Sequence, residues 1–171
     1  MQELHATALE IRILVAVAAK IGGRSLEQRL QAQGIPISGM QYGMLRLLSH
    51  QQYTISELSR RMLLAPATLV PAVDGLERQG FLTRGHDPSD RRRTPLALTD
   101  RGGEVLARVP AVHADDALVG GLAAMGAEKR LQLLELLREL LSAMPESRDA
   151  AGEIARSILL MDDQSATSDP T

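Results

Sequence analysis

The chain has 171 residues, a length that suits one domain, and 44% of them are hydrophobic, enough to bury a core. It has no cysteine, which excludes disulfides, thiolate metal sites and thiol-based redox sensing. The longest apolar run near the start, residues 13–21, contains Lys20 and is shorter than the roughly 20 residues that a membrane span needs. No signal-peptide cleavage pattern follows it, so we expect a cytoplasmic protein.

The net charge of −2 hides an uneven distribution. Residues 46–101 hold nine basic and six acidic side chains, a balance of +3 that leaves −5 for the rest of the chain. A basic middle segment between acidic ends is typical of a module that faces a polyanion. All nine basic residues in this segment are arginines. A general preference for arginine explains that composition, but it does not explain where the arginines lie.

The apolar spacing predicts a helix over residues 4–32. Gly22-Gly23 interrupts it, and Ser25 with Gln28 forms a capping-box pattern, so we expect the helix to kink or break at the glycines and to restart at Ser25. A second capping box, Ser38 with Gln41, predicts a helix that ends near residue 49.

A third capping box, Thr54 with Glu57, begins a short amphipathic helix that carries Arg60 and Arg61 on its polar face. After a turn at residues 63–65, Pro66 suits the first turn of another helix, which ends at Gly80. The residues of this second helix that we expect to face the core are Leu69, Val73 and Leu76. Two short helices joined by a tight turn predict a helix-turn-helix.

Residues 81–84 and 94–99 change to period-two alternation, with turn-forming residues between them, and predict a β-hairpin with a charged tip. Pro95 cannot donate to a β-ladder, so its strand should be an edge strand. Thr99 can cap a helix over residues 100–119, in which Pro110 predicts a kink or a break.

Residues 127–144 have leucines on more than one helical face. The helix must then be buried on two sides, and we expect the second partner to be another subunit; the alternative is a central core helix. After Pro145 the composition turns to Ala, Ser and Asp. There we expect one short docked helix around residues 154–160 and disorder in the last ten residues.

The wing region carries a spaced set of residues: Leu76-Glu77, Gly80, Leu82, Arg84, Asp87-Pro88, Asp90-Arg91-Arg92, Leu96, Leu98-Thr99 and Gly102. This set resembles the wing signature of the MarR family of bacterial transcription regulators, and the element order agrees over roughly residues 5–144. The implied fold is mainly α with a small β-hairpin wing. It comprises one domain over residues 1–145, with dimerisation helices at 1–33 and 120–145, a winged helix-turn-helix lobe at 38–99, a connecting helix at 100–119, and an extension at 146–171.

The resemblance implies a homodimer that binds a pseudo-palindromic operator in double-stranded DNA, usually as a repressor, and releases it when a small, often aromatic or phenolic, anion binds. It places residues 66–79 in the major groove and residues 85–94 in the minor groove, with Arg92 as the minor-groove finger. The candidate DNA-binding residues are Thr68, Arg78, Arg84, Asp90, Arg91, Arg92, Arg93, Arg60 and Arg61. The candidate effector-pocket residues are Ile11, Arg12, Val15, Met40, Tyr42, Met44 and His113.

The expected recognition helix departs from its relatives, because Val70, Pro71 and Gly75 stand where family members commonly show Ser, Thr, Asn or Arg. We therefore expect few direct contacts with base edges. Thr68 can hydrogen-bond to a base, and the side chains of Ala67, Val70 and Ala72 can contact thymine methyl groups. Specificity would depend on the wing and on DNA shape.

An enzyme is not expected, since the four histidines lie far apart and the chain has neither a phosphate-binding glycine loop nor a nucleophile elbow. We expect no cofactor and no metal. The competing interpretation is a winged-helix module that binds a protein through the apolar run 69–73 and has no sequence-specific DNA binding.

Overall fold

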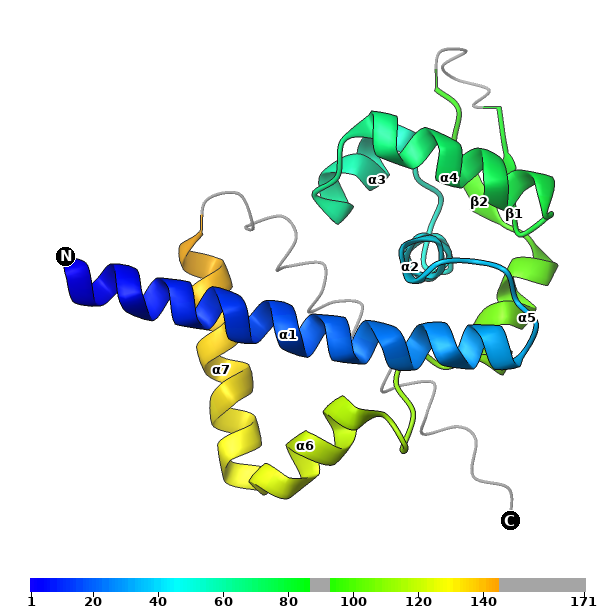
Figure 1. Cartoon of the computed structure of the whole chain (residues 1–171). Coiled ribbons are helices and arrows are strands. Elements are labelled where there is room, and N and C mark those ends of the chain that lie inside the picture. Colours follow the sequence, from blue (N-terminus) through cyan, green and yellow to red (C-terminus); the bar gives the residue numbers. More distant parts are fainter. Residues whose placement is uncertain (87–92, 145–171) are drawn as a thin grey trace.

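The protein is represented by a computed structural model, which describes residues 1–86 and 93–144 (Figure 1). Within these ranges the chain forms seven helices and one two-stranded antiparallel sheet, the mainly α architecture with a small hairpin that the sequence predicts. In chain order the elements are α1 (Gln2–Ala32), α2 (Gly39–Leu48), α3 (Ile55–Met62), α4 (Pro66–Arg78), β1 (Leu82–Arg84), β2 (Leu96–Leu98), α5 (Asp100–Arg108), α6 (Ala117–Met125) and α7 (Ala127–Ala143).

Helices α2 to α5 and the hairpin pack into a lobe beside the C-terminal half of α1 (Figure 1). Among the described residues, every buried hydrophobic side chain lies between Leu30 and Val109. Met44 and Leu45 of α2 are fully buried in this core. The lobe therefore has a contiguous hydrophobic core formed within one chain.

The two capping boxes predicted inside the lobe are confirmed. The side chain of Ser38 accepts a hydrogen bond from the backbone N–H of Gln41, and the Gln41 side chain accepts one from the backbone N–H of Ser38. Thr54 and Glu57 make the same reciprocal pair at the start of α3. Each box satisfies backbone donors that a helix N-terminus otherwise leaves unpaired, which fixes where α2 and α3 begin.

The hairpin pairs Leu82 with Leu98 and Arg84 with Leu96. Leu96 also exchanges two backbone hydrogen bonds with Tyr53, which precedes α3 (N···O 2.8 and 3.3 Å). In this two-stranded sheet β2 is an edge strand, as predicted, and the bridge to Tyr53 lies on its outer side. Pro95 itself lies just before β2, so its missing N–H removes nothing from the ladder.

The predicted break in the first helix is wrong, because α1 runs without interruption through Gly22 and Gly23. The hydroxyl of Ser25 donates to the carbonyl of Ile21 (3.4 Å), as a residue inside a helix does, and does not cap a new one. A glycine costs about 1 kcal/mol relative to alanine inside a helix but is compatible with helical geometry. Burial of Leu30 in the lobe core anchors the C-terminal end of the helix.

The single connecting helix predicted over residues 100–119 is also wrong, since α5 ends at Arg108 and α6 begins at Ala117. Pro110 disfavours the helical conformation at the preceding residue, and Val109 is extended and buried. The segment between the helices is held to α1 by Arg29, whose guanidinium donates to the Ala111 carbonyl (3.0 Å). The break that Pro110 predicts thus separates two helices rather than bending one.

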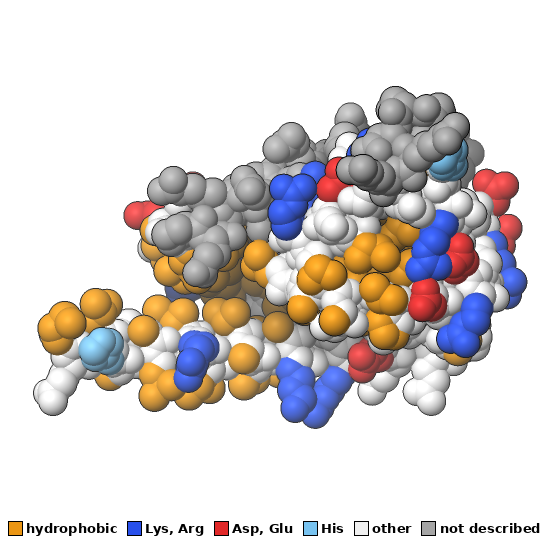
Figure 2. Space-filling view, turned by 90° about the horizontal axis from the view of Figure 1, so that it is seen from above, with side chains coloured by type: hydrophobic (Ala, Val, Ile, Leu, Met, Phe, Trp, Pro, Cys, Tyr) orange, Lys and Arg blue, Asp and Glu red, His pale blue; other side chains and the backbone are white. Residues whose placement is uncertain are grey.

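The α6 and α7 helices contain no buried residue. Hydrophobic side chains are exposed along both helices. They are also exposed along the N-terminal half of α1, which projects away from the lobe (Figure 2). They include Leu4, Leu9, Ile11, Ile13, Leu14, Val15, Val17, Ile21, Leu118, Met125, Leu131, Leu134, Leu136, Leu137 and Leu140. The alternative of α7 as a central core helix is therefore wrong for a single chain.

None of the described helices is both long and apolar enough to cross a lipid bilayer. The expectations for the tail after Pro145 lie outside the described residues, as do those for the wing tip at residues 87–92.

Candidate nucleic-acid interface

The α3–turn–α4 pair has the geometry of a helix-turn-helix. Leu63 adopts the left-handed conformation (φ 52°) that ends α3, and the hydroxyl of Ser59 donates to the Leu64 carbonyl (2.5 Å) across the turn. Pro66 then occupies the first turn of α4, where its missing N–H would be unpaired in any residue. The predicted turn and the predicted start of the second helix are both confirmed.

Two faces of α4 differ in character. Leu69, Val73 and Leu76 are fully buried, as predicted. The exposed positions are Pro66, Ala67, Thr68, Val70, Pro71 and Arg78. Figure 2 looks onto the side of the lobe that carries α4 and shows hydrophobic side chains there among arginines and carboxylates. The exposed face is thus poor in hydrogen-bonding side chains.

Ala72 faces the core with 6% of its surface exposed, so the expectation that its methyl group reads DNA is wrong. Pro71 lies on the exposed side inside α4 and has no N–H to donate to the carbonyl of Ala67. The helix continues to Arg78 because its opposite face is packed into the core.

The amide of Gln41 in α2 joins the start of its own helix to α4. Its oxygen accepts from the backbone N–H of Ser38 (3.0 Å), and its nitrogen donates to the carbonyl of Ala72 (3.3 Å). A Cβ at position 75 would lie 3.2 Å from that nitrogen, so Gly75 gives the amide room. Gly75 lowers the intrinsic stability of α4, but it permits the hydrogen bond from Gln41 that positions this helix.

Arg84, at the end of β1, binds two carboxylates of α4. One guanidinium nitrogen donates to Asp74 (2.6 Å) and the other pairs with Glu77. These hydrogen bonds and charges, led by the Asp74 bond, raise the pKa of Arg84 above its ordinary value. The predicted DNA-binding residue Arg84 is therefore engaged within the protein.

The Glu57 carboxylate joins α3 to the stem of the wing. It accepts the Thr54 backbone N–H (2.7 Å) through one oxygen and pairs with Arg93 (3.2 Å) through the other. The backbone hydrogen bond from Thr54 lowers the pKa of Glu57 most, with a further contribution from Arg93. The base of the wing is thus held to the helix-turn-helix by an acid that also caps a helix.

A shallow groove of about 680 Å³ lies between the start of α3 and the wing stem. Three of the predicted DNA-binding arginines line it, namely Arg60, Arg84 and Arg93. The guanidinium of Arg61 lies over the Tyr53 ring instead, 4.3 Å from its centroid. Asp90, Arg91 and Arg92 lie outside the described residues.

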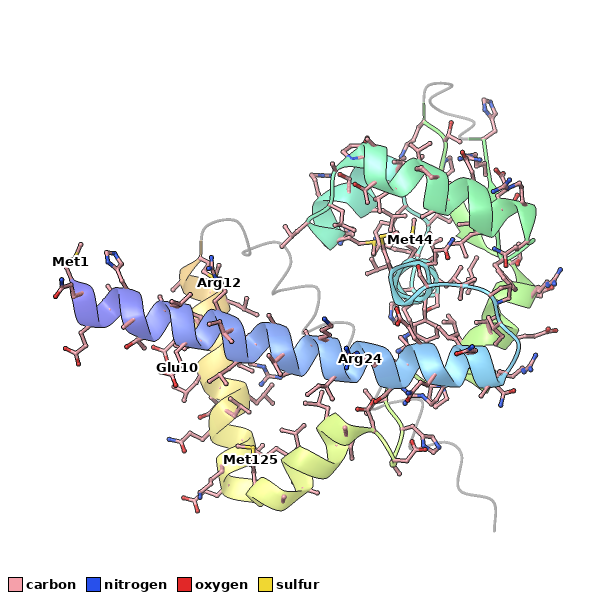
Figure 3. All side chains as sticks on the ribbon, viewed as in Figure 1. Met1, Glu10, Arg12, Arg24, Met44 and Met125 are labelled. Carbon is pink, nitrogen blue, oxygen red and sulfur yellow. The ribbon has the colours of Figure 1, made fainter. Side chains whose placement is uncertain are left out.

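The residues predicted to line an effector pocket are not brought together in the single chain. Tyr42 and Met44 are buried in the lobe core, and the Tyr42 hydroxyl donates to the Val109 carbonyl (2.6 Å); burial raises the pKa of Tyr42. Arg12 lies on the projecting half of α1, far from Met44 beneath α4 (Figure 3). Met40 is half-buried, whereas Ile11, Val15 and His113 are exposed.

Other groups in this junction pair within the chain. His113 lies 2.5 Å from the carboxylate of Asp115 and lowers its pKa. Arg29 pairs with the buried carboxylate of Asp116 (3.5 Å), which also accepts from the backbone N–H of Leu118 (2.9 Å) and caps α6. The junction between α1 and α6 is therefore held by a charged contact that the sequence did not indicate.

Three contacts at the interface escaped the sequence analysis: Gln41 with Ala72, Glu57 with Arg93, and Arg84 with its two carboxylates. The sequence did hold a partial signal for the contacts of Glu57 and of Arg84. The capping box exposes one oxygen of Glu57, and Asp74 and Glu77 lie three residues apart on one face of a helix. The identity of the partner depends on how the hairpin folds back on α3 and α4.

A helix-turn-helix followed by a β-hairpin defines a winged helix-turn-helix protein. The model of the MarR family matches residues 38–94, which cover α2, both helices of the pair and the wing. The HTH-type transcriptional repressor MdtR of Bacillus subtilis (strain 168) is 32% identical over 105 residues, 59% of this chain and 66% of MdtR. The winged-helix lobe of the chain matches the MarR family, which confirms the resemblance seen in its sequence.

Two solved structures extend the comparison. Sco3205, a MarR family transcriptional regulator from Streptomyces coelicolor solved in complex with DNA, is 26% identical, with a TM-score of 0.68 over 82% of this chain and 89% of Sco3205. CouR from Rhodococcus jostii RHA1, bound to p-coumaroyl-CoA, is 25% identical, with a TM-score of 0.60 over 78% of this chain and 90% of CouR. The sequence alignments span 54% and 66% of the first two curated relatives, so the chain matches only part of their length.

Proposed function

We propose that this chain is a transcriptional regulator that binds double-stranded DNA through α4 and the wing. The observation that carries the proposal is the exposed face of α4 beside an arginine-lined groove, in a lobe that matches the MarR family. The likeness to Sco3205, solved in complex with DNA, supports it. Binding, rather than catalysis, is the function in this proposal.

In the proposed complex α4 lies in the major groove. Thr68 hydrogen-bonds to a base edge, and the exposed side chains of Ala67, Val70 and Pro71 contact thymine methyl groups. This apolar surface discriminates weakly, so the wing and the shape of the DNA supply most of the specificity. Arg92 enters the minor groove, oriented by Asp90, while Arg91 and Arg93 contact phosphates. A guanidinium suits a narrow groove because it is less strongly hydrated than an ammonium.

The proposed regulator is a homodimer whose two lobes bind a pseudo-palindromic operator. The exposed hydrophobic side chains of α1, α6 and α7 supply the dimer surface, because no part of the described chain covers them. We propose repression as its effect on transcription; MdtR, a relative, is named a repressor.

A small, often aromatic or phenolic, anion is the proposed effector, and it would bind where the dimer helices meet the lobe. CouR, which has a similar fold, was solved with p-coumaroyl-CoA. The candidates Ile11, Arg12 and Val15 are exposed on α1 and so remain open to a second subunit. Completion of such a pocket by the dimer partner accounts for its absence from the described part of one chain.

The alternative, a winged-helix module that binds a protein, is supported by the apolar run 69–73. Only Val70 and Pro71 of that run are exposed, whereas Leu69, Ala72 and Val73 are buried. Two exposed side chains form a small surface for a protein partner, so the DNA-binding proposal is favoured.

A gel-shift series on the DNA that flanks its own gene tests the proposal, with a scrambled duplex of equal length as the control. We expect specific binding that weakens steeply between 50 and 200 mM salt, on the order of 10³-fold if about six phosphates are contacted. Candidate aromatic acids should release the DNA. Affinity that does not change with salt would favour a protein partner instead.

The roles of α4 and the wing are separated by two variants in the same assay. We expect Arg92→Ala to weaken operator binding far more than Thr68→Ala, because the wing supplies most of the specificity. Equal losses, or no loss for Arg92→Ala, would contradict this division.

A further inference from the structure

The face of α4 next to the exposed recognition surface carries negative charge. Asp74 and Glu77 line a shallow surface groove together with Pro71 and Arg78. Their side chains are 48% and 36% exposed. Residues 66–78 carry two acids and one arginine, so α4 alone has a net charge of −1. A helix that approaches the DNA backbone with this charge is repelled by it.

The fork of Arg84 lies against both of these acids at once. Two nitrogens of one guanidinium bind the two carboxylates, and the side chain of Arg84 is 29% exposed. A guanidinium suits this role because its donors are fixed in a plane and can serve two acceptors together. With Arg84 included, the charges of α4 sum to zero.

We propose that Arg84 is a positioning residue that neutralises the acids of α4 and so permits the helix to approach DNA, rather than a phosphate ligand. The inference rests on the proposed function of DNA binding. It separates the arginines of the lobe into two groups. Arg84 acts through Asp74 and Glu77, whereas Arg91, Arg92 and Arg93 of the wing make the proposed contacts with the nucleic acid.

The two roles predict different behaviour when the acids are removed. A phosphate ligand remains necessary whether or not Asp74 and Glu77 are charged. A counter-ion becomes dispensable once both acids are neutral. The decisive comparison is therefore Arg84→Gln in the native background against Arg84→Gln combined with Asp74→Asn and Glu77→Gln. The two acid substitutions are isosteric, and Arg84→Gln removes the charge and shortens the side chain.

The experiment uses the full chain and measures affinity for the duplex flanking its own gene between 50 and 200 mM salt, with urea unfolding of each variant. We expect Arg84→Gln to weaken binding about tenfold or more. Asp74→Asn/Glu77→Gln should bind at least as well as the native chain, and the triple variant should return to within about threefold of it. The triple variant should keep the native salt slope, because the number of phosphates contacted is unchanged.

A triple variant that stays as weak as Arg84→Gln, with a salt slope lower by about one, overturns the inference and makes Arg84 a phosphate ligand. If Arg84→Gln lowers the urea midpoint and the triple variant restores neither midpoint nor affinity, Arg84 is only a structural tie, which also overturns it. Failure of the native chain to bind any duplex overturns the proposed function as well. A native chain that binds while rescue fails overturns the inference alone.

Discussion

The winged-helix lobe and the helices outside it use their hydrophobic residues in opposite ways. In the lobe, Leu45, Leu58 and Leu76 have no exposed surface, whereas in α7 Leu131 and Leu136 are more than half exposed. Leucine content is high in both regions, so hydrophobicity alone does not decide burial. The buried leucines of the lobe are surrounded by other elements of their own chain, while the N-terminal half of α1 and α7 are separate rods (Figure 1). The contrast is what the proposed homodimer predicts, with the lobe folded within one chain and the outer helices covered by a second chain.

The same substitution in the two regions gives the sharpest test. We expect Leu45→Ala to lower the free energy of unfolding by about 2–5 kcal/mol at any protein concentration, since it leaves a cavity in a packed core. Leu136→Ala should affect stability only through assembly, and so should lose its effect on dilution. Urea unfolding over a hundredfold range of concentration measures both. Equal, concentration-independent losses would remove the distinction between the regions.

A pair of neighbouring glycines in α5 tests how tightly the lobe is packed. A Cβ on Gly102 would meet the Phe81 carbonyl and lie 2.6 Å from the Leu98 side chain, whereas a Cβ on Gly103 would meet nothing within 4 Å. We expect Gly102→Ala to destabilise the lobe by about 1–3 kcal/mol. Gly103→Ala is the matched control and should stabilise it by up to about 1 kcal/mol, since alanine favours helix. Thermal unfolding of the two variants should shift in opposite directions.

Charges placed on α7 test whether a second chain covers its exposed hydrophobic face. Leu136→Asp with Leu140→Asp puts two carboxylates on one exposed face of the helix, where a hydrophobic interface is expected. The dimer dissociation constant should rise at least tenfold, about 1.4 kcal/mol, while the lobe stays folded. Sedimentation velocity with far-UV circular dichroism measures both properties, and Ser142→Asp, on another face of α7, is the polar control. A native chain that sediments as a monomer would refute the proposed assembly.

The link between α2 and α4 should contribute about 1 kcal/mol. Gln41→Ala removes both the capping acceptor for Ser38 and the donor to the Ala72 carbonyl. Gln41→Glu keeps the acceptor but not the donor, so its loss in urea unfolding should be smaller. If Gln41→Glu costs as much as Gln41→Ala, the capping bond contributes nothing.

The smallest expected effect is a pH dependence centred on Glu57. Its pKa is lowered in the folded chain, so its contribution to stability is complete above the ordinary value of 4.5 and disappears as the pH falls through the folded value. Glu57→Gln should therefore lower the free energy of unfolding at pH 7, by about 0.2–1 kcal/mol as for a partly exposed ion pair. The difference between native chain and variant should close in acid, below the folded pKa. A difference that stays constant from pH 7 into acid would exclude this carboxylate as the cause.

Local chemistry in the sequence determined most of the elements. The capping boxes at Ser38 and Thr54, the proline at position 66 and the alternation around the hairpin each specify backbone geometry within a few residues, so the helix-turn-helix and the wing were predictable. The same local reasoning was wrong at Gly22-Gly23, where a glycine permits a break but does not require one, and the packing of α1 keeps the helix continuous. It was partly wrong after Asp100, where the break predicted at Pro110 is present but separates two helices, α5 and α6, instead of interrupting one.

Only the tertiary structure decided which side chains meet. The pairing of Arg84 with two acids, of Glu57 with Arg93 and of Gln41 with Ala72 depends on how the hairpin and α2 lie against the helix pair, which no spacing along the chain specifies. The exposure of α7 is likewise a property of the arrangement, since its leucine pattern fits burial in one chain or between two. Short-range backbone preferences are encoded residue by residue, whereas contacts between distant segments form only when the core has brought those segments together.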